Sequence, residues 1–285
     1  MPDAHTEAPM DYILYEVRDR VAVITLNRPQ QRNAQNKQLL VELDRAWDMA
    51  AEDKNVRCIV LKANGPHFSA GHDIARDETY AAKVAEALGD VDTRGLMQLH
   101  TWEGKYYLGF CRKWRDINKP SIAAVQGACI AAGLMLAWPC DLIIAAENAK
   151  FRDPVALMGI GGVEYHGHTW EFGARKAKEM LFTASAITAE EARQLGMVNK
   201  VVPLESLEDE AMAMANKIAQ MHPFALAMAK RAVNQTLDVM GQYAALQSVF
   251  DIHQLGHGSA LAQCGEAVVM GLDGLKVANK KSGGV

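Results

Sequence analysis

Two short clusters of small residues place backbone N–H groups where they can bind a negatively charged oxygen. The first is Phe68-Ser-Ala-Gly-His-Asp-Ile74, and the second is Gly127-Ala-Cys-Ile-Ala-Ala-Gly-Leu134. In each, a segment typical of a strand ends at Gly or Ala, which let another group approach the backbone. A helix that begins within the second cluster turns its free N–H groups toward that space. Two such donors would stabilise negative charge developing on a carbonyl oxygen, and removing one costs about 2.7–4 kcal/mol.

Side chains that can transfer protons gather in a later segment, Gly159-Ile-Gly-Gly-Val-Glu-Tyr-His-Gly-His168. Its Glu164 is our candidate general acid or base, because a carboxyl group close to a reacting carbon can take or return a proton. Tyr165 lies beside it, and Asp153 is a second carboxylate nearby in the sequence. The alternative is that these groups are solvated loop residues or helix caps.

The histidines do not predict a metal site. His166 and His168 form a His-x-His pair, but the spacing suggests no third ligand, whereas protein-bound zinc usually takes three or four. His253 and His257 would share one face of a helix, with the same limitation. We therefore expect no bound metal.

Hydrophobic periodicity predicts the elements that carry these residues. Strands are expected at 12–18, 21–26, 56–62, 121–125, 141–146 and 197–202, and helices at 36–53, 129–138 and 188–195. After Pro203 the pattern is helical throughout, over 207–221, 223–240 and 243–253. The sequence therefore predicts a mixed α/β core over residues 1–204 and a helical region over 205–285.

Composition excludes several classes of protein. The 285 residues carry a net charge of -4, with 49% hydrophobic and 22% charged residues, so neither a nucleic acid nor a membrane surface is an expected partner. The apolar stretch 121–146 is divided by Gln126, Gly127 and Pro139, which argues against a membrane helix. The five cysteines include no CxxC pair, so reduced thiols and a cytoplasmic location are expected.

The chain resembles the enoyl-CoA hydratase/isomerase (crotonase) family over nearly its whole length. The matching motifs are Ala22-Val-Ile-Thr-Leu-Asn-Arg-Pro29 with Asn33-Ala34, Phe68-x-Ala-Gly-x-Asp-Ile74, Lys119-Pro-x-Ile-Ala-Ala-Val-x-Gly127, Cys140-Asp-Leu-Ile-Ile-Ala145 and Ala189-x-x-Ala-x-x-x-Gly-x-Val198. The resemblance implies a spiral of ββα units with a C-terminal helical region that builds homotrimers or dimers of trimers. It also implies an acyl-CoA substrate, with coenzyme A as part of that substrate and no separate cofactor.

The resemblance also implies roles for particular residues. The backbone N–H groups of His72 and Ala132 would form the oxyanion hole, and Ala70, Asp73 and Ile74 would lie beside the bound pantetheine and thioester. The family usually has glycine where this chain has Ala132. An alanine still donates its N–H, provided that the local backbone does not require a conformation reserved for glycine.

The resemblance fails at the two usual catalytic glutamates. The matching positions are Met135 and Val155, and neither side chain can exchange a proton. A hydratase that uses the standard pair of glutamates is therefore disfavoured. We expect an enzyme of lipid or fatty-acid catabolism, similar to enoyl-CoA hydratase lyases, that stabilises a thioester enolate and uses Glu164 instead.

Two other functions remain open. Phe68-Ser-Ala-Gly-His-Asp-Ile74 also resembles the corresponding stretch of methylmalonyl-CoA decarboxylases, which use a Tyr where this chain has Gly162, so an acyl-CoA decarboxylase or hydrolase is one alternative. A non-catalytic acyl-CoA-binding protein is the other.

The aromatic residues between Ile74 and Lys119 would wall a pocket for a bulky acyl group or simply belong to the core.

Overall fold

The computed structural model describes residues 9–74, 89, 94–271, 274 and 277. Its main element is a six-stranded sheet in the order β1-β2-β3-β4-β6-β9. The first pair is antiparallel and the others are parallel. The strands are β1 (Ile13–Arg18), β2 (Val21–Leu26), β3 (Cys58–Ala63), β4 (Ser121–Val125), β6 (Leu142–Ala146) and β9 (Lys200–Val202). A second sheet contains β5 (Ala128–Ile130), β7 (Lys150–Arg152) and β8 (Ile187–Thr188).

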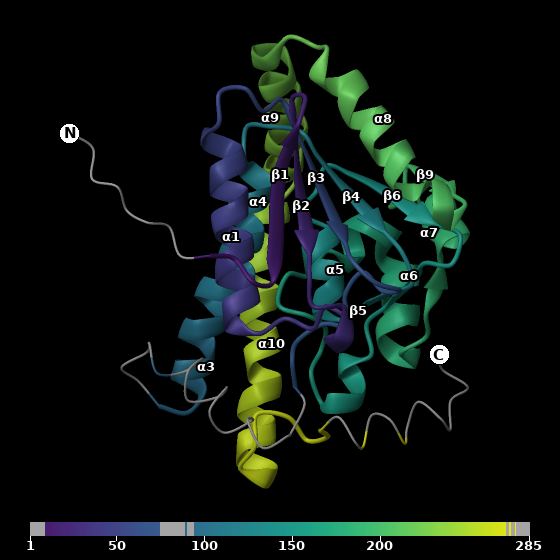
Figure 1. Cartoon of the computed structure of the whole chain (residues 1–285). Helices are drawn as coiled ribbons and strands as arrows, with labels where there is room; N and C mark the ends of the chain where they lie inside the picture. The colour runs from purple at the N-terminus through teal and green to yellow at the C-terminus, as the bar shows by residue number, and fades with distance from the viewer. Residues whose placement is uncertain (1–8, 75–88, 90–93, 272–273, 275–276, 278–285) are drawn as a thin grey trace, which may run out of the picture.

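Helices cover both faces of the large sheet (Figure 1). Successive strand residues point to opposite faces, so Ala22 and Ile24 join a core with α1 (Lys37–Glu52), while Val21 and Val23 join a core with α8 (Leu207–Ala219). A strand buried on both faces has a continuous apolar sequence, which explains why β2 is entirely buried.

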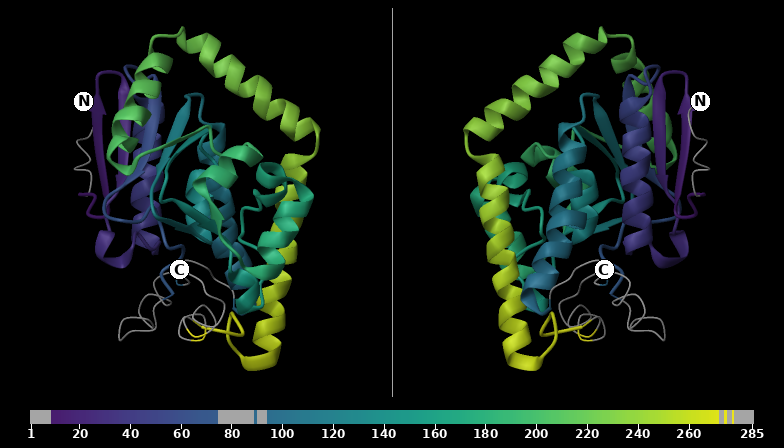
Figure 2. Two further views of the ribbon diagram at one scale, coloured as in Figure 1. Left: turned by 90° about the vertical axis from the view of Figure 1, so that its right-hand side faces the viewer. Right: turned by 90° about the vertical axis from the view of Figure 1, so that its left-hand side faces the viewer.

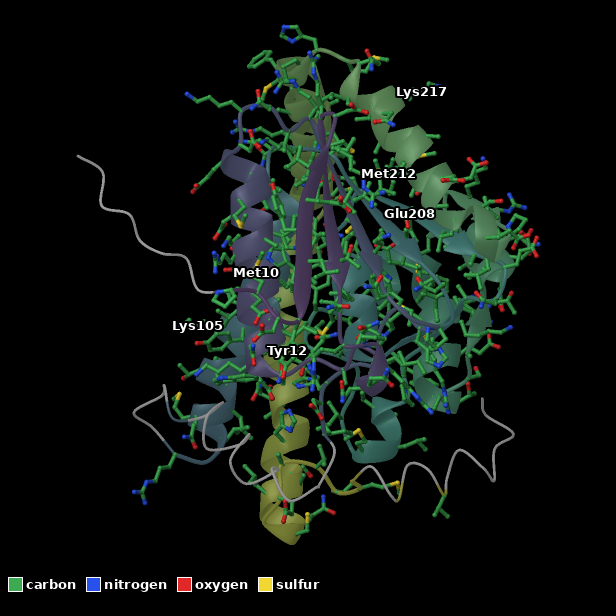
Figure 3. The ribbon with its side chains drawn as sticks, in the orientation of Figure 1. Met10, Tyr12, Lys105, Glu208, Met212 and Lys217 are labelled. Carbon is green, nitrogen blue, oxygen red and sulfur yellow. The ribbon has the colours of Figure 1, made fainter. Side chains whose placement is uncertain are left out.

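The polar side of α8 is tied to the sheet by ion pairs. Glu208, labelled on α8 in Figure 3, accepts hydrogen bonds from Lys62 of β3 and from Arg18 of β1, the latter at 2.7 Å. Met212, one turn further along α8, packs against the apolar face. Although α8 lies within the region predicted to be helical after residue 204, it therefore packs on the sheet.

The remaining elements surround the two sheets. They are η1 (Pro29–Gln31), α3 (Leu96–Glu103), the π-helical η2 (Gly104–Gly109), α4 (Phe110–Asp116), α5 (Ala132–Ala137), η3 (Val155–Met158), α6 (His168–Thr183), α7 (Ala189–Leu195), η4 (Leu204–Ser206), α9 (Pro223–Val239) and α10 (Gln242–Cys264). Figure 2 shows α9 and α10 in succession along the outside of the molecule. None of the described helices is both long and apolar enough to cross a bilayer.

The second cluster of small residues folds differently from the prediction. A helix over 129–138 was expected, but 128–130 form strand β5 and the helix begins at Ala132. Because Ala, Cys and Ile in a short run fit a buried strand as well as a buried helix, periodicity does not separate the two. The β5 strand matters for function because it brings the second cluster beside the first.

The aromatic stretch before Lys119 is helical over residues 96–116, and the part over 75–88 and 90–93 lies outside the described residues. Trp102, Tyr106, Tyr107 and Trp114 are all buried in the main core. These rings therefore have the core role that was one of the two expectations. The π-helical turn η2 carries Tyr106 and Tyr107, and π-helical turns are often found at functional sites.

Candidate active site

The two small-residue clusters pack directly against each other. Ser69 and Cys129 form a parallel bridge, and the Ile130 N–H donates to the Ser69 carbonyl at 3.0 Å. A Cβ at Gly71 would lie 2.9 Å from the Ile130 oxygen, and one at Gly133 would lie 2.5 Å from the Ser69 oxygen. Only glycine fits at these two contacts, which explains why small residues recur in both clusters.

The contact brings the two predicted oxyanion donors to the same place. The hypothetical Cβ of Gly71 lies 3.3 Å from the Ala132 nitrogen, so the turn that carries His72 adjoins the start of α5. As the first residue of α5, Ala132 has no helical carbonyl to which its N–H can donate. Among the described residues, the His72 N–H makes no backbone hydrogen bond either. Both donors are therefore available for an oxygen of a ligand.

Gln35 holds the two turns together. Its backbone N–H donates to the Gly71 carbonyl at 2.8 Å, and its carbonyl accepts from the Asp73 N–H at 2.9 Å. Its buried side-chain amide donates to the Ala132 carbonyl at 2.9 Å. One residue thus fixes the backbone on both sides of the predicted hole, a role that the sequence did not reveal.

The backbone at Ala132 does not require glycine, whereas the backbone of Ala131, one residue earlier, is strained. Ala132 lies in α5 with helical geometry, whereas Ala131 caps the helix with φ +50° and ψ -121°. That combination is normally occupied by glycine in a turn, and such outliers cost about 1–3 kcal/mol. The condition set for Ala132 is therefore met, and the backbone strain lies at Ala131.

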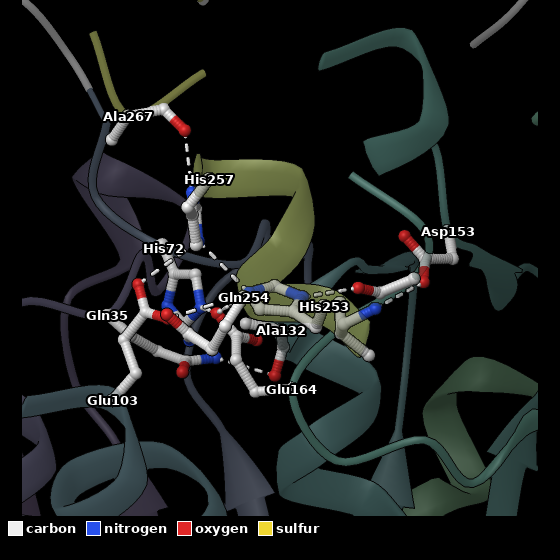
Figure 4. Close-up of polar contacts among 12 residues, drawn as sticks. Gln35, His72, Glu103, Ala132, Asp153, Glu164, His253, Gln254, His257 and Ala267 are labelled. Carbon is white, nitrogen blue, oxygen red and sulfur yellow. Dashed lines mark hydrogen bonds and ion pairs between the residues drawn. The ribbon is translucent and has the colours of Figure 1, made fainter. Parts of the chain in front are cut away.

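Glu164 lies beside His72, as Figure 4 shows. His72 Nε2 is 3.1 Å from Glu164 Oε1, and the His72 ring stacks on Tyr107 with 3.9 Å between ring centroids. The Glu164 side chain is only 4% exposed. Within the described part of the chain, Glu164 Oε2 and His72 Nδ1 are buried without a hydrogen-bond partner. Buried polar atoms usually have partners, so these two are candidates to contact a ligand or a water molecule.

The surroundings of Glu164 favour its ionised form. Burial alone raises the pKa of this carboxyl group, but the adjacent imidazoles of His72 and His253 outweigh burial and hold the pKa below its ordinary value. An ionised carboxylate is a proton acceptor. Glu164 is therefore prepared to act first as a base.

The other proton-transfer groups of the loop form no hydrogen bond or ion pair with Glu164, whose described partners are His72 and His253. Asp153 and His168 are fully buried and paired at 2.9 Å, and Asp153 also accepts from the Val163 N–H at 3.0 Å. Tyr165 is buried in the main core, where burial raises its pKa. Burial lowers the pKa of His166 to about 4. Of this group, the structure brings only Glu164 to the oxyanion turns, while Asp153 acts as a structural clamp on the loop.

The predicted pantetheine-contacting residues have mixed surroundings. The Asp73 carboxylate pairs with Arg28 at 3.2 Å, with both side chains at most 8% exposed. The Ala70 N–H donates to the Arg32 carbonyl at 3.0 Å, and Ile74 packs beside Met158 and Ile160. Their roles in ligand binding remain predictions.

The two positions of the usual glutamates are apolar in the structure too. Met135 is buried in α5, and Val155 packs against the core from η3. Neither position offers a group that can transfer a proton.

Three polar residues near Glu164 were missed as a group. Glu103 of α3 faces His253 and His257 of α10, and His253 Nε2 is 3.6 Å from Glu164 Oε1. The four-residue spacing of the histidines predicted a shared helix face, which the structure confirms. Glu103 lies 151 residues before its contact Gln254 in the chain, and no sequence signal connects it to the two histidines.

Known proteins place these features in one family. A profile described as enoyl-CoA hydratase/isomerase matches residues 16–254. A putative enoyl-CoA hydratase, EchA13 of Mycobacterium tuberculosis, is 45% identical over 87% of this chain and 81% of its own length. The 2,3-dehydroadipyl-CoA hydratase of Escherichia coli is 33% identical over 81% of this chain and 84% of its own length.

A solved structure supports the same assignment. The crystal structure of a probable enoyl-CoA hydratase from Mycobacterium smegmatis superposes with a TM-score of 0.84, with 57% identity, and covers 91% of this chain and 100% of its own. The expected fold class, a crotonase spiral followed by helices, is thereby confirmed. Because a family profile and several relatives match most of its length, the chain belongs to the enoyl-CoA hydratase/isomerase family, within the crotonase superfamily.

Proposed function

We propose that this protein is an enoyl-CoA hydratase-type lyase in which one carboxylate, Glu164, replaces the usual pair of glutamates. The observation that carries the proposal is the 3.1 Å contact between Glu164 and the side chain of His72, whose own backbone N–H is one of the two oxyanion donors. The names of the relatives support an enoyl-CoA thioester as the substrate and fatty-acid metabolism as the setting. We keep the cytoplasm as the proposed location.

The proposed reaction begins with the thioester oxygen between the N–H groups of His72 and Ala132. Hydrogen bonds from these donors draw electron density from the conjugated double bond, so the β-carbon becomes electrophilic. Glu164 takes a proton from a water molecule as its oxygen attacks that carbon. The carboxyl group then holds the proton that the α-carbon of the enolate requires, and the net result is addition of water.

The test is turnover of a series of enoyl-CoA esters of increasing chain length by the wild type and by Glu164→Gln. Loss of one general acid or base lowers kcat by roughly 10²- to 10⁴-fold, and we expect a loss in that range. Glu147→Gln, at an exposed position after β6, is the matched control and should retain full activity. Full activity of Glu164→Gln would rule out this assignment.

The same assay separates the alternatives. Release of CO2 from a suitable acyl-CoA would identify the reaction as decarboxylation, and release of free CoA would identify it as hydrolysis. Tight acyl-CoA binding without any turnover would identify a binding protein. The structure gives no specific support to decarboxylation, because Tyr165, the tyrosine nearest the position used by decarboxylases, is buried in the core.

A further inference from the structure

Three buried side chains converge at the junction of α3 and α10. His253 and His257 lie one turn apart on α10 with their Nε2 atoms 3.0 Å apart. The two oxygens of the Glu103 carboxylate face them, Oε2 at 3.5 Å from His253 and Oε1 at 3.4 Å from His257. All three side chains are at most 8% exposed. Figure 4 shows the three groups pointing toward one another.

The backbone fixes which ring nitrogens carry protons. His253 Nδ1 is 2.7 Å from the Gly162 carbonyl, and His257 Nδ1 is 2.6 Å from the Ala267 carbonyl. A carbonyl oxygen only accepts, so each Nδ1 must donate its N–H. In a neutral imidazole the other nitrogen, Nε2, then holds a lone pair. Without a metal ion, the carboxylates beside this pair favour a proton on it, since they raise the pKa of both histidines against the effect of burial. When both imidazoles are neutral, two lone pairs and a carboxylate face one small space, where a metal ion can supply the positive charge instead of the proton.

From this arrangement we propose that Glu103, His253 and His257 bind a divalent transition metal ion of the zinc class. Zinc bonds of about 2.0–2.2 Å in tetrahedral geometry place neighbouring ligand atoms roughly 3.3–3.5 Å apart. The two Nε2 atoms are 3.0 Å apart, and each lies 3.4–3.5 Å from one of the two Glu103 oxygens, which is close to that range. With one ligand atom from each residue, the three atoms all lie within 4.8 Å of one another. Imidazole nitrogen with carboxylate oxygen is a donor set that suits zinc better than magnesium or calcium.

The residues around the ligands support the same assignment. Histidines that bind metals usually donate their second ring N–H to a backbone carbonyl or a carboxylate, and both histidines do so here. Gln254 Nε2 donates to Glu103 Oε2 at 2.5 Å, which holds the carboxylate in place. These contacts fix the orientation of all three ligands before any ion binds.

The site adjoins the candidate catalytic carboxylate. Glu164 Oε1 is 3.6 Å from His253 Nε2, and a divalent ion would help to balance the two buried carboxylates of Glu103 and Glu164. The inference concerns metal binding alone, so it stands or falls independently of the reaction. The spacing of the histidines predicted no metal because it pointed to no third ligand, and Glu103 lies far from them in the sequence.

The experiment measures metal in the full chain, purified without a histidine tag or chelator. Metal analysis by mass spectrometry should find about one equivalent of zinc or a similar ion per chain. Competition with a chromophoric chelator should show that His257→Gln and Glu103→Gln bind zinc at least 100-fold more weakly than the wild type. His100→Gln, which changes a partly exposed histidine of α3 paired with Asp251, is the matched control and should bind normally.

A second readout uses the wild type alone, in case a variant fails to fold. Cobalt(II) added to metal-free protein should give the visible absorption of a tetrahedral site, and zinc should abolish it. The competing explanation is a proton shared between His253 and His257 in place of a metal. Metal-free wild type that binds zinc no more tightly than His257→Gln, and that gives no cobalt absorption, would overturn the proposal in favour of the shared proton.

Discussion

His72 contributes to the site in two separable ways. Its backbone N–H is a proposed oxyanion donor, whereas its imidazole contacts the Glu164 carboxylate at 3.1 Å and stacks on Tyr107. A substitution removes the second contribution and leaves the first. The imidazole lowers the pKa of Glu164 through its electrostatic interaction and its hydrogen bond. We therefore infer that it holds the Glu164 carboxylate in place and favours the ionised form.

We therefore predict a defined loss for His72→Ala. A hydrogen bond to a charged group is worth about 1.5–3 kcal/mol, so kcat should fall roughly 10- to 150-fold while KM changes little. Steady-state kinetics with the best enoyl-CoA substrate provide the measurement. His72→Asn, which keeps a side-chain donor, should recover part of the loss. An unchanged kcat in His72→Ala would mean that only the backbone of this residue matters.

Sequence reasoning reached Glu164 but not its surroundings. Glu164 stood out because the two usual glutamate positions hold Met135 and Val155, which left few carboxylates near the expected site. Its contacts with His72 and His253 join residues 92 and 89 positions apart in the chain, and those contacts depend on how the loop folds. A single sequence records residue types and spacing, but not the direction in which a loop side chain points.

At the scale of elements, the start of α5 presents a proposed oxyanion donor from a strained backbone turn. Helix α5 spans only six residues, and Ala131 precedes it with φ +50°. The neighbouring contacts explain why the strain persists: the Ala131 N–H donates to the Arg152 carbonyl at 2.8 Å, and the Ala131 carbonyl accepts from Leu134 at 2.9 Å. These bonds hold the turn that presents the Ala132 N–H.

The strain predicts opposite effects for two neighbouring substitutions. Ala131→Gly should stabilise the protein by about 1 kcal/mol, because relief of about 1–3 kcal/mol of backbone strain exceeds the 0.5–1 kcal/mol entropic cost of glycine. Ala132→Gly, at a helical position, should destabilise it by up to about 1 kcal/mol. Thermal unfolding followed by circular dichroism measures both. If both variants were destabilised equally, Ala131 would not be strained.

The same region shows which elements a sequence can predict. The helix expected over 188–195 forms as α7, and the Thr188 side chain caps it by accepting from the Glu191 N–H at 3.1 Å. That signal is local. Strand β5 was missed because it is defined by its pairing with β7. The sequence of a three-residue apolar run does not indicate which strand it will pair with.

At the scale of the whole molecule, the C-terminal helices divide into parts with different surroundings. Helix α8 buries its apolar residues on the sheet, and α10 buries His253 and Phe250 beside the candidate site. Helix α9 has no buried residue, and its Phe224 and Val239 are 67% and 86% exposed. Large apolar side chains gathered on one exposed helix indicate a surface that another protein covers.

We propose that further copies of this chain cover α9, in the trimer or dimer of trimers that the family resemblance implies. Light scattering coupled to gel filtration should give three or six times the chain mass of 31.2 kDa. Replacing both Phe224 and Val239 with Glu should shift the mass toward the monomer, because charged groups would be buried in an apolar contact. Val41→Glu, at an exposed position on α1, is the control and should leave the mass unchanged. A monomeric wild type at micromolar concentration would contradict this assembly, and α9 would then need a different partner.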